Sequence, residues 1–441
     1  MEKFVITGGR PLKGTVTVGG AKNVAMKAVV AGLLTNETLT VANIPLISSV
    51  LGTAKIVEPL GVEVKRIDHT LTISAKNIHK YKVPLELGGL YRTATMVMGP
   101  MLARFGKAIV PNPGGCRLGK RPVDWHIQAL IQMGAKISYK DGYFYGEANG
   151  LHGATIKFPK NSHTGTETVI LAAVLATGTT VIENAAAEPE IDNLILLLKH
   201  MGAVIERQGR TITIHGVKKL GGTKFTIMPD RNEVVTYAIA AIATDGDVVI
   251  HGTERENLKS FLTALDQVGG GWEAMDQTTT RFFSQGVLKP TDIVTSFYPG
   301  FMTDWQAPWA VLATQAQGAS SIHETVFESR FSYVAELRKM GAKIDFFDPE
   351  VKDPEKFYNF KWADRIEDYH QGIKIFGPRP LHEAVVEITD LRAGATLVVA
   401  ALVARGKSVL LGVEHIDRGY EKFDEQLRQL GAKITREKED L

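Results

Sequence analysis

IQALIQMGAKI, residues 127–137, contains the pattern that decides the fold, and VAELRKMGAKI, residues 334–344, repeats it. In both stretches apolar residues at helical spacing lead to a glycine, and apolar residues at strand spacing follow it. A glycine directly after a helix can adopt positive φ and end that helix, so the chain is free to enter a strand. The stretch therefore predicts a unit in which a helix is followed by a strand.

The same phrase recurs along the whole chain. Its glycines stand 67 to 90 residues apart, at Gly61, Gly134, Gly202, Gly269, Gly341 and Gly431. A second phrase keeps the same period: an Ala-rich apolar helix ends in a polar turn and enters a strand, as in residues 169–182 and 396–411. Two independent phrases with one period predict six α/β units of about 70 residues, each with two helices and several strands.

The composition of the helices predicts where they lie. The Ala- and Val-rich helices are apolar nearly all round and should be buried, whereas their charged partners should face solvent. Six such units favour two domains of three units each, with a crossing point near 225–234 (FTIMPDRNEV). We expect one domain over 22–229 and a second over 1–21 plus 230–441.

The last interval between the repeated glycines is the longest, which predicts an insertion near 347–365. Its charges, prolines and aromatic residues are typical of a surface loop. The loop is either without a specific role or a contact for a partner. Its sequence does not decide between these two interpretations.

Composition excludes several classes of protein. With 51 basic and 48 acidic residues the net charge is +3, so bulk charge favours neither nucleic acid nor another polyanion as a partner. The single cysteine excludes an intramolecular disulfide framework and fits a reducing cytosol. The chain starts without a signal-peptide pattern and has no apolar run long enough for a bilayer, so we expect a cytoplasmic protein with no membrane contact.

No motif predicts a metal or a cofactor. HExxH and CxxC are absent, and no two histidines stand four residues apart. Gly114, Gly119 and Lys120 have the spacing of a P-loop, but Arg121 replaces the Ser or Thr that would hold magnesium. Pro122 then begins the next helix without an N–H to offer. A nucleotide P-loop is therefore not predicted.

The loop 111–126 (PNPGGCRLGKRPVDWH) is nevertheless the most informative segment. Its glycines and prolines predict an exposed loop, and Cys116 stands among Arg117, Lys120 and Arg121. Neighbouring cations stabilise a thiolate and lower the pKa of a thiol. Cys116 is either a reactive thiol or an idle surface residue, and the local sequence weighs the two about equally.

Other candidates are single polar residues at the ends of predicted elements. Lys22 and Asn23 follow two glycines and precede an apolar helix, so Asn23 has an ordinary alternative role as a helix N-cap. Asp304, in FMTDWQAPWA, has the same alternative. Taken one by one, the basic candidates are no more than surface charges: Arg92, Arg330, Arg392 and Arg418.

Taken together, these segments resemble the family of UDP-N-acetylglucosamine 1-carboxyvinyltransferases, which are enolpyruvyl transferases. The resemblance covers nearly the whole chain, and its most specific stretches are the cysteine loop and the IDRGYE segment. Matching segments include GGAKN (19–23), PGGCRLGKRPVD (113–124), TDWQA (303–307), ETVFESRF (324–331), TDLRAGATLV (389–398) and EHIDRGYE (414–421). The resemblance implies a two-domain inside-out α/β barrel fold with three repeated units in each domain.

The resemblance also implies a reaction. Enolpyruvyl passes from phosphoenolpyruvate to the 3-hydroxyl of UDP-N-acetylglucosamine through a tetrahedral intermediate, with release of phosphate and without a cofactor. This is the first committed step of peptidoglycan precursor synthesis. In such a reaction, cations bind the anionic substrate, a base accepts the hydroxyl proton and an acid protonates the enol carbon C3.

Roles follow from the resemblance residue by residue. Asp304 is implied as the base, Cys116 as the acid and fosfomycin target on a lid loop, and Lys22, Arg121 and Arg418 as clamps for phosphate and carboxylate. Arg suits such planar anion recognition. The remaining substrate contacts are implied at Asn23, Arg92, Pro122, Val123, Asp124, Trp125, Lys160, His163, Thr164, Gly165, Val326, Arg330 and Arg392.

The sequence departs from the family pattern where that family holds the uridine and diphosphate. Trp125 replaces a leucine, the family's diphosphate-contacting lysine aligns on Asn161, and Glu167 adds a carboxylate. These changes leave open a paralogue with a different acceptor, or a non-catalytic ligand sensor on the same fold. The shikimate-pathway relative is disfavoured, because Tyr91-Arg92-Thr93-Ala94 stands in place of its signature.

Overall fold

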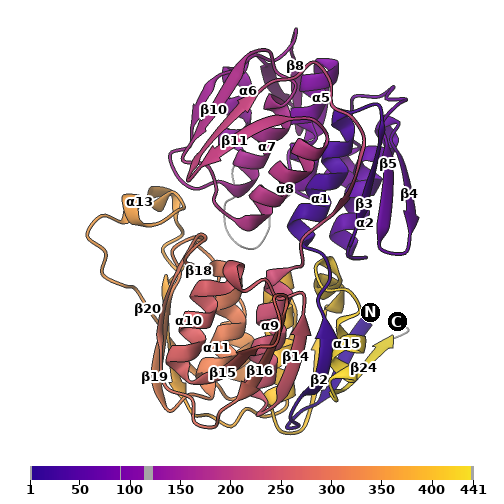
Figure 1. The fold of residues 1–441 in the computed structure, drawn as a ribbon. Helices are drawn as coiled ribbons and strands as arrows, with labels where there is room; N and C mark the ends of the chain where they lie inside the picture. The colour runs from indigo at the N-terminus through magenta and orange to yellow at the C-terminus, as the bar shows by residue number, and fades with distance from the viewer. Residues whose placement is uncertain (1, 90, 114–122, 439–441) are drawn as a thin grey trace. The chain divides into compact units, whose positions relative to one another are not determined.

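The computed structural model describes residues 2–89, 91–113 and 123–438. They form two compact units, each with its own hydrophobic core (Figure 1). We call residues 20–228 the N-terminal unit and residues 2–19 with 229–438 the C-terminal unit. The chain passes between the units after Gly19 and again after Met228.

The N-terminal unit contains three sheets among its described residues. Their strand orders are β13 (Thr223–Thr226), β3 (Thr38–Ala42), β5 (Thr70–Ser74) and β4 (Glu63–Ile67); β6 (Lys107–Pro111), β8 (Tyr143–Glu147) and β7 (Lys136–Lys140); and β11 (Val204–Gln208), β12 (Thr211–His215), β10 (Thr179–Glu183) and β9 (Thr155–Lys157). The helices are α1 (Lys22–Ala31), η1 (Gly32–Leu34), α2 (Ser48–Val57), η2 (Glu58–Leu60), α3 (Leu85–Gly88), α4 (Thr93–Met96), α5 (Met98–Phe105), α6 (Asp124–Gln132), α7 (His163–Ala173) and α8 (Pro189–His200).

The C-terminal unit also contains three sheets among its described residues. Their orders are β22 (Val385–Glu387), β23 (Lys407–Leu411), β1 (Glu2–Thr7) and β24 (Lys433–Lys438); β15 (Gly270–Ala274), β16 (Thr279–Ser284), β14 (Asp247–His251) and β2 (Lys13–Thr17); and β18 (Phe301–Met302), β17 (Asp292–Ser296), β19 (Gly318–His323), β21 (Gly372–Gly377) and β20 (Lys343–Phe347). The helices are α9 (Arg231–Ala243), η3 (Arg255–Leu258), α10 (Lys259–Val268), η4 (Thr303–Trp305), α11 (Gln306–Thr314), α12 (Val334–Lys339), α13 (Pro354–Phe357), η5 (Trp362–Asp364), α14 (Leu391–Val403), η6 (Val413–Arg418) and α15 (Phe423–Gln429).

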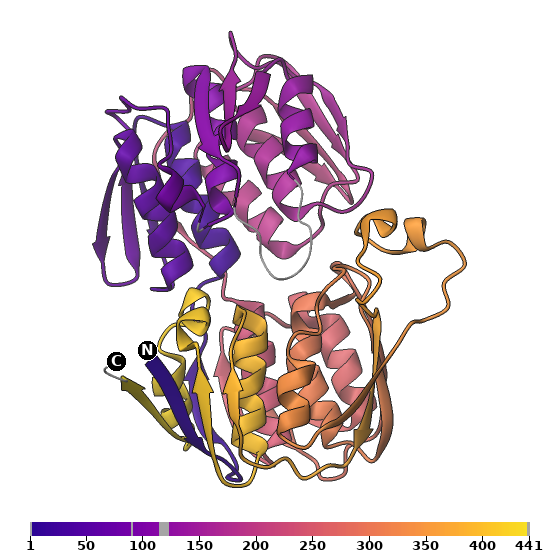
Figure 2. The ribbon, with the colours of Figure 1, turned by 180° about the vertical axis from the view of Figure 1, so that it is seen from behind.

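The Ala-rich helices are buried, as their composition predicts. Every residue of α9 and α11 is buried, and these two helices pack against α14 in the centre of the C-terminal unit. Figure 2 shows the golden helix α14 beside the orange helix α11, with strands on the outside. In the N-terminal unit α7 is likewise buried except for its first two residues. The expected fold class is confirmed: the apolar helices lie inside, and the three sheets of each unit match the three expected repeated units.

The repeated glycine has the backbone conformation that the sequence predicts. All six copies have φ between +84° and +108°, and each follows a helix and precedes a strand. Two turns of the second phrase differ, because neither Asn36 nor Gly246 has positive φ. Beside Gly246, Asp245 adopts positive φ instead, at +55°. The turn is therefore kept while the residue that makes it moves by one position.

The insertion after β20 is more structured than the surface loop expected from its composition. It contains α13 and η5, and Tyr358 within it is 1% exposed. Its aromatic residues stack on one another, which the count of charges and prolines did not predict. Within the described part of the chain, no helix has both the length and the apolar composition that a bilayer crossing requires.

Candidate active site

Asp304 lies between two arginines in the C-terminal unit. Its Oδ1 accepts a hydrogen bond from Nη2 of Arg330 at 2.5 Å, and its Oδ2 lies 3.4 Å from Nη2 of Arg392. The arginine side chains are 4% and 8% exposed, while that of Asp304 is 30% exposed. Two buried guanidinium groups share one carboxylate, so these three side chains together carry excess positive charge and are suited to a further anion.

Arg392 is also held by two linked hydroxyl groups. Its Nη1 donates to the phenol oxygen of Tyr420 at 2.9 Å, and that oxygen lies 2.8 Å from the hydroxyl of Thr236 on α9. Burial alone would lower the pKa of Arg392, but Tyr420, Asp304 and Asp230 outweigh it and raise that pKa. Arg392 therefore stays charged although it is buried.

The segment after β19 is fixed by the carboxylate of Glu324. This buried side chain accepts hydrogen bonds from the amides of Val326 and Phe327 at 2.7 and 3.0 Å, and from the hydroxyl of Thr303 at 2.8 Å. Burial raises the pKa of Glu324. Because Thr303 directly precedes Asp304, Glu324 ties the predicted contact Val326 to the segment that carries the predicted base.

Asn23 and Asp304 are not helix N-caps, which was the alternative role for both. Helix α1 begins at Lys22 after Ala21, without a side-chain cap, so Asn23 is its second residue and not its N-cap. Asp304 lies inside η4, and both η4 and α11 begin without a side-chain cap. Neither residue is explained by helix capping.

Arg418 ends η6 as an exposed residue. It precedes by two residues Tyr420, which binds Arg392, so the IDRGYE segment connects the exposed cation to the buried cluster. Four of the predicted residues are thus associated within the C-terminal unit: Asp304, Arg330 and Arg392 by direct contact and Val326 through Glu324.

The N-terminal unit holds a second polar cluster at the start of α7. Lys27 of α1 and Glu167 of α7 form a buried ion pair with Nζ and Oε2 at 3.1 Å, and Nε2 of His163 lies 3.2 Å from Oε1 of the same carboxylate. Burial acts to lower the pKa of His163, but Glu167 and Glu188 offset it, and the pKa is raised. His163 and Glu167 both lie in the segment 160–167, where substrate contacts are predicted. Lys27 was not predicted, and it is the partner of Glu167.

Predicted acceptor contacts lie on two helices, α6 and α7, which meet at His126. This buried residue of α6 lies beside Trp125, and its Nε2 is 2.8 Å from the hydroxyl of Thr164 on α7. Ser162 caps α7 by accepting a hydrogen bond from the amide of Gly165 at 3.1 Å. A Cβ at Gly165 would lie 2.5 Å from the Ser162 hydroxyl and 2.9 Å from the Phe158 ring, so a larger residue there would displace the capping side chain.

Asn161, a departure from the family pattern, is structural. Its amide donates to Oε1 of Glu188 at 3.1 Å, and its side-chain oxygen accepts from Nη2 of Arg210 at 2.7 Å. Asn161 is 8% exposed, whereas the neighbouring Lys160 is partly exposed. Of these two candidates for a diphosphate contact, the structure leaves Lys160 on the accessible side.

The remaining predicted residues lie either at the starts of helices or outside the described residues. Lys22, Asn23 and Arg92 are partly exposed at the starts of α1 and α4, Val123 is buried before α6, and Asp124 is exposed at its first position. Cys116, Arg121 and Pro122 lie outside the described residues.

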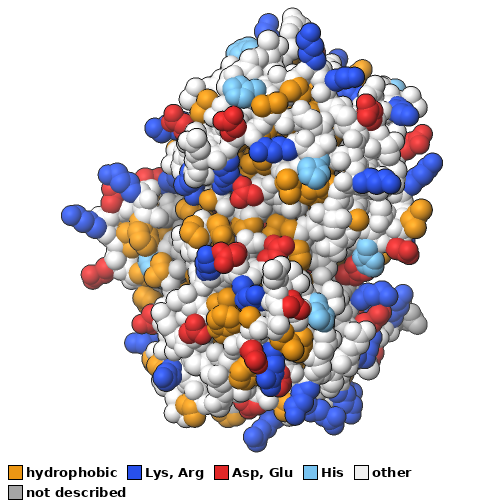
Figure 3. All heavy atoms as spheres, in the orientation of Figure 1, with side chains coloured by type: hydrophobic (Ala, Val, Ile, Leu, Met, Phe, Trp, Pro, Cys, Tyr) orange, Lys and Arg blue, Asp and Glu red, His pale blue; other side chains and the backbone are white. Residues whose placement is uncertain are grey.

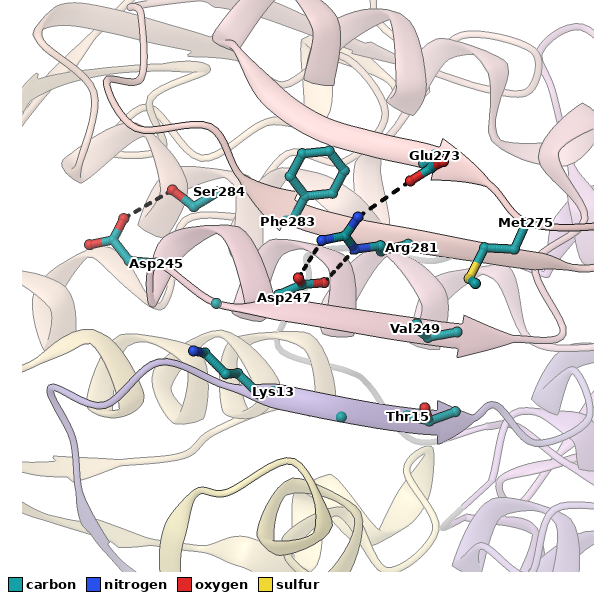
Figure 4. A pocket seen from close by; sticks show the side chains of 12 residues that line it. Lys13, Thr15, Asp245, Asp247, Val249, Glu273, Met275, Arg281, Phe283 and Ser284 are labelled. Atoms are coloured by element: carbon teal, nitrogen blue, oxygen red, sulfur yellow. Dashed lines mark hydrogen bonds and ion pairs between the residues drawn. The ribbon is translucent and has the colours of Figure 1, made fainter.

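A shallow pocket of about 740 Å³ lies on the outer face of the sheet that contains β14, β16 and β2. Figure 4 shows Arg281 in it, bound by Asp247 at 2.6 Å and by Glu273 at 3.4 Å. Its guanidinium group is already matched by carboxylates, and none of the predicted site residues lines the pocket. Within the described ranges, no group of three or more His, Cys, Asp or Glu could hold a metal ion.

Sequence reasoning missed the residues that support the site. Tyr420 lies inside the matching segment 414–421, and Lys27 lies four residues after the GGAKN segment, but nothing in their spacing marks either as a partner. His126 and Glu324 lie in the cysteine loop and in the segment 324–331, again without a signal of their own. A buried polar residue in an apolar helix, such as Lys27 in α1, is the one signal that was present.

Known proteins match this chain over nearly its whole length. The model of the family "EPSP synthase (3-phosphoshikimate 1-carboxyvinyltransferase)" matches residues 6–438. A UDP-N-acetylglucosamine 1-carboxyvinyltransferase from Acidobacterium capsulatum is 43% identical over 99% of this chain and 96% of its own length. The protein of the same name from Koribacter versatilis is 42% identical with the same coverage.

Solved structures share the fold. The enolpyruvyl transferase NikO from Streptomyces tendae has a TM-score of 0.87 and 23% identity, covering 100% of this chain and 99% of its own. An EPSP synthase from Acinetobacter baumannii has a TM-score of 0.75 and 18% identity, covering 99% and 100%. At these identities the structures show a common fold and nothing finer.

Proposed function

This chain belongs to the EPSP synthase family of carboxyvinyltransferases, and from that premise we propose that it transfers enolpyruvyl from phosphoenolpyruvate to the 3-hydroxyl of UDP-N-acetylglucosamine, with release of phosphate. Relatives named for this reaction match it at 40–43% identity over nearly its full length. The observation in the structure that carries the proposal is Asp304 between the buried guanidinium groups of Arg330 and Arg392. With its single cysteine the chain suits the cytoplasm, where we place the reaction.

Binding of phosphoenolpyruvate to the two arginines would allow Asp304 to act as a base. A carboxylate that binds two guanidinium groups is a poor proton acceptor. The carboxylate and phosphate of phosphoenolpyruvate compete for the same donors, and binding of this anion would loosen the ion pairs. Asp304 then accepts the proton of the sugar hydroxyl, whose oxygen forms a bond to C2 of the enol.

The enol carbon C3 gains a proton in the same addition. The resemblance assigns this acid role to Cys116, which lies outside the described residues. Loss of a proton from C3 then expels phosphate and restores the double bond. Arg392 is charged when this sequence begins, because Tyr420, Asp304 and Asp230 oppose the effect of burial, and the substrate anion replaces Asp304 as its partner once that carboxylate is protonated. A fixed cation stabilises charge that develops on the departing group.

The cluster at the start of α7 supports the choice of acceptor. His163, held by Glu167, and Lys160 offer basic groups beside the N-terminus of α7, where backbone N–H groups favour an anion. The diphosphate of a sugar nucleotide is an anion that would suit these groups. Thr164 contacts His126, the residue after Trp125 in α6.

Inorganic phosphate release from phosphoenolpyruvate, with and without UDP-N-acetylglucosamine, tests the proposal. We expect release that depends on the sugar nucleotide. A protein that melts cooperatively but releases no phosphate with both substrates present would contradict the assigned acceptor. Release that is equally fast without the sugar nucleotide would contradict transfer altogether.

A further inference from the structure

The connection between β20 and β21, residues 348–371, is far longer than its strands require. The two strands pair antiparallel up to Phe347 opposite Gly372, so a short turn would close the hairpin. Instead the chain extends outward, forms α13 and η5, and returns (Figure 1). Hydrophobic and charged side chains lie together on this segment in Figure 3. The extra residues are therefore available for another role.

An aromatic cluster gives the segment a fixed shape. The ring of Tyr358, which is 1% exposed, stacks on Trp362 with centroids 4.5 Å apart and planes 9° apart. Arg365 covers the same Trp362 ring at 4.3 Å. The phenol oxygen of Tyr358 lies 3.0 Å from Nε2 of His323, the last residue of β19. The cluster thus attaches the segment to the end of a core strand.

The segment also binds the backbone on both sides of Val326. The amide of Asn359 donates to the carbonyl of Thr325 at 2.8 Å. At the other end, the carbonyl of Gln371 accepts from the amide of Glu324 at 2.8 Å, and the Gln371 side chain donates to the carbonyl of Glu328 at 3.0 Å. Residues 324–328 are therefore held from outside by the segment and from inside by the Glu324 carboxylate.

We propose that residues 348–371 are a positioning element for the substrate segment 324–328, with Tyr358 and Trp362 as its anchors. Val326 is one of the substrate contacts that the resemblance implies, and we assign it to the acceptor because the neighbouring arginines, Arg330 and Arg392, bind the donor anion. Through Val326 the element sets the affinity for the acceptor substrate. This inference rests on the proposed function, which supplies the acceptor. Arg330 and Arg392 have their own partners in Asp304 and Tyr420, so the donor substrate depends on the element much less.

Hydrogen exchange and kinetics of Tyr358→Ala and Trp362→Ala test the proposal. We expect exchange in residues 323–330 to become at least about tenfold faster, because the outer backbone bonds are lost. The KM for UDP-N-acetylglucosamine should rise about fivefold or more, while the KM for phosphoenolpyruvate changes less than about twofold. Tyr358→Phe keeps the stack, removes one hydrogen bond, and should retain most of the protection.

Lys356→Ala is the matched control, because Lys356 lies on the same segment, is 88% exposed and pairs only with Asp353 among the interactions seen in the described residues. Unchanged exchange in 323–330 of either alanine variant would overturn the positioning role. Faster exchange with an unchanged KM for the sugar nucleotide would overturn its effect on the acceptor. The exchange measurement decides the first point even in a protein without turnover, so the failure of this inference is distinguishable from failure of the proposed function.

Discussion

Asp304 shows how one residue can be described in two ways until its partners are known. In sequence it stands where a helix N-cap would stand, and in the structure it is a partly exposed carboxylate bound by two buried arginines. Its partners come from residues 330 and 392, which belong to other segments of the chain. The charge balance of this cluster, and not the local sequence, makes Asp304 a candidate base.

Asp304→Asn should lower kcat by about a hundredfold or more, because a neutral amide cannot accept the hydroxyl proton, and base catalysis contributes about 10²–10⁴-fold. Binding of UDP-N-acetylglucosamine, measured by calorimetry, should remain detectable. Asp292→Asn is the control, since among the described residues the side chain of this exposed aspartate makes one hydrogen bond, accepted from Ser321. Near-normal turnover of Asp304→Asn would contradict the assigned role.

Glu233 is a buried carboxyl group near this cluster, since the charge of Arg392 partly opposes the rise in its pKa, and its titration should be visible in stability. It is 3% exposed and accepts the amide of Gly19 at 3.0 Å; burial, with Asp230, raises its pKa to about 8. Between its unfolded pKa of about 4.5 and about 8, the native protein holds a proton that the unfolded chain has lost. The contribution of Glu233 to stability is therefore full at low pH and is lost as pH rises through about 8.

Glu233→Gln keeps an acceptor for Gly19 but cannot titrate, so its stability relative to the natural protein should increase with pH. Thermal unfolding at about pH 5.5 and about pH 8.5 measures this, and each unit of pKa difference corresponds to about 1.4 kcal/mol. Glu256→Gln, an exposed change, controls for net charge. A difference between natural protein and variant that does not vary with pH would contradict the buried titration.

At the scale of the element, the repeated glycine terminates each of six helices. Gly202 has φ of +101°, and no heavy atom lies within 4 Å of the position that a Cβ would occupy, so the strain of a side chain there comes from the backbone alone. Helix α8 ends just before it and β11 begins just after it. The same local solution is used in both units.

Gly202→Ala should destabilise the protein by about 1–2 kcal/mol, because an L-residue is disfavoured at positive φ. Gly221→Ala is a matched control in the same unit, since Gly221 has no positive φ and its added Cβ would have its nearest atoms at 3.6 and 3.7 Å. Chemical denaturation followed by circular dichroism measures both. Equal effects of the two changes would show that backbone strain is not what glycine relieves at position 202.

At the scale of the molecule, the two units have separate hydrophobic clusters. In the C-terminal unit, Phe261 packs edge-on against Trp305 and Trp309, and it is fully buried. In the N-terminal unit, Leu171 is fully buried in α7. A cavity made in one cluster should therefore weaken that unit first.

Phe261→Ala should cost about 3–5 kcal/mol, and hydrogen exchange should lose protection mainly in residues 229–438. Leu171→Ala, with an expected cost of about 2–5 kcal/mol, should give the converse pattern in residues 20–228. Mass spectrometry of exchanged peptides separates the two. A uniform loss of protection from either variant would show that the units unfold as one.

Sequence alone predicted much of the fold because its signals are local and repeated. The period of the glycines predicted six units, and six sheets among the described residues agree with that count. The apolar helices predicted what is buried, and the burial of α9 and α11 confirms it. The resemblance predicted the reaction class, which family membership confirms. The roles of individual site residues remain predictions.

Only the tertiary structure decided how polar side chains are partnered. Lys27 with Glu167, Arg392 with Tyr420, and Tyr358 with His323 are each far apart in the chain. Periodicity arises from one helix or strand meeting the core, so it is written in neighbouring residues. A hydrogen bond between distant residues has no such period: the energy that selects it exists only once the packed elements bring its atoms within about 3 Å.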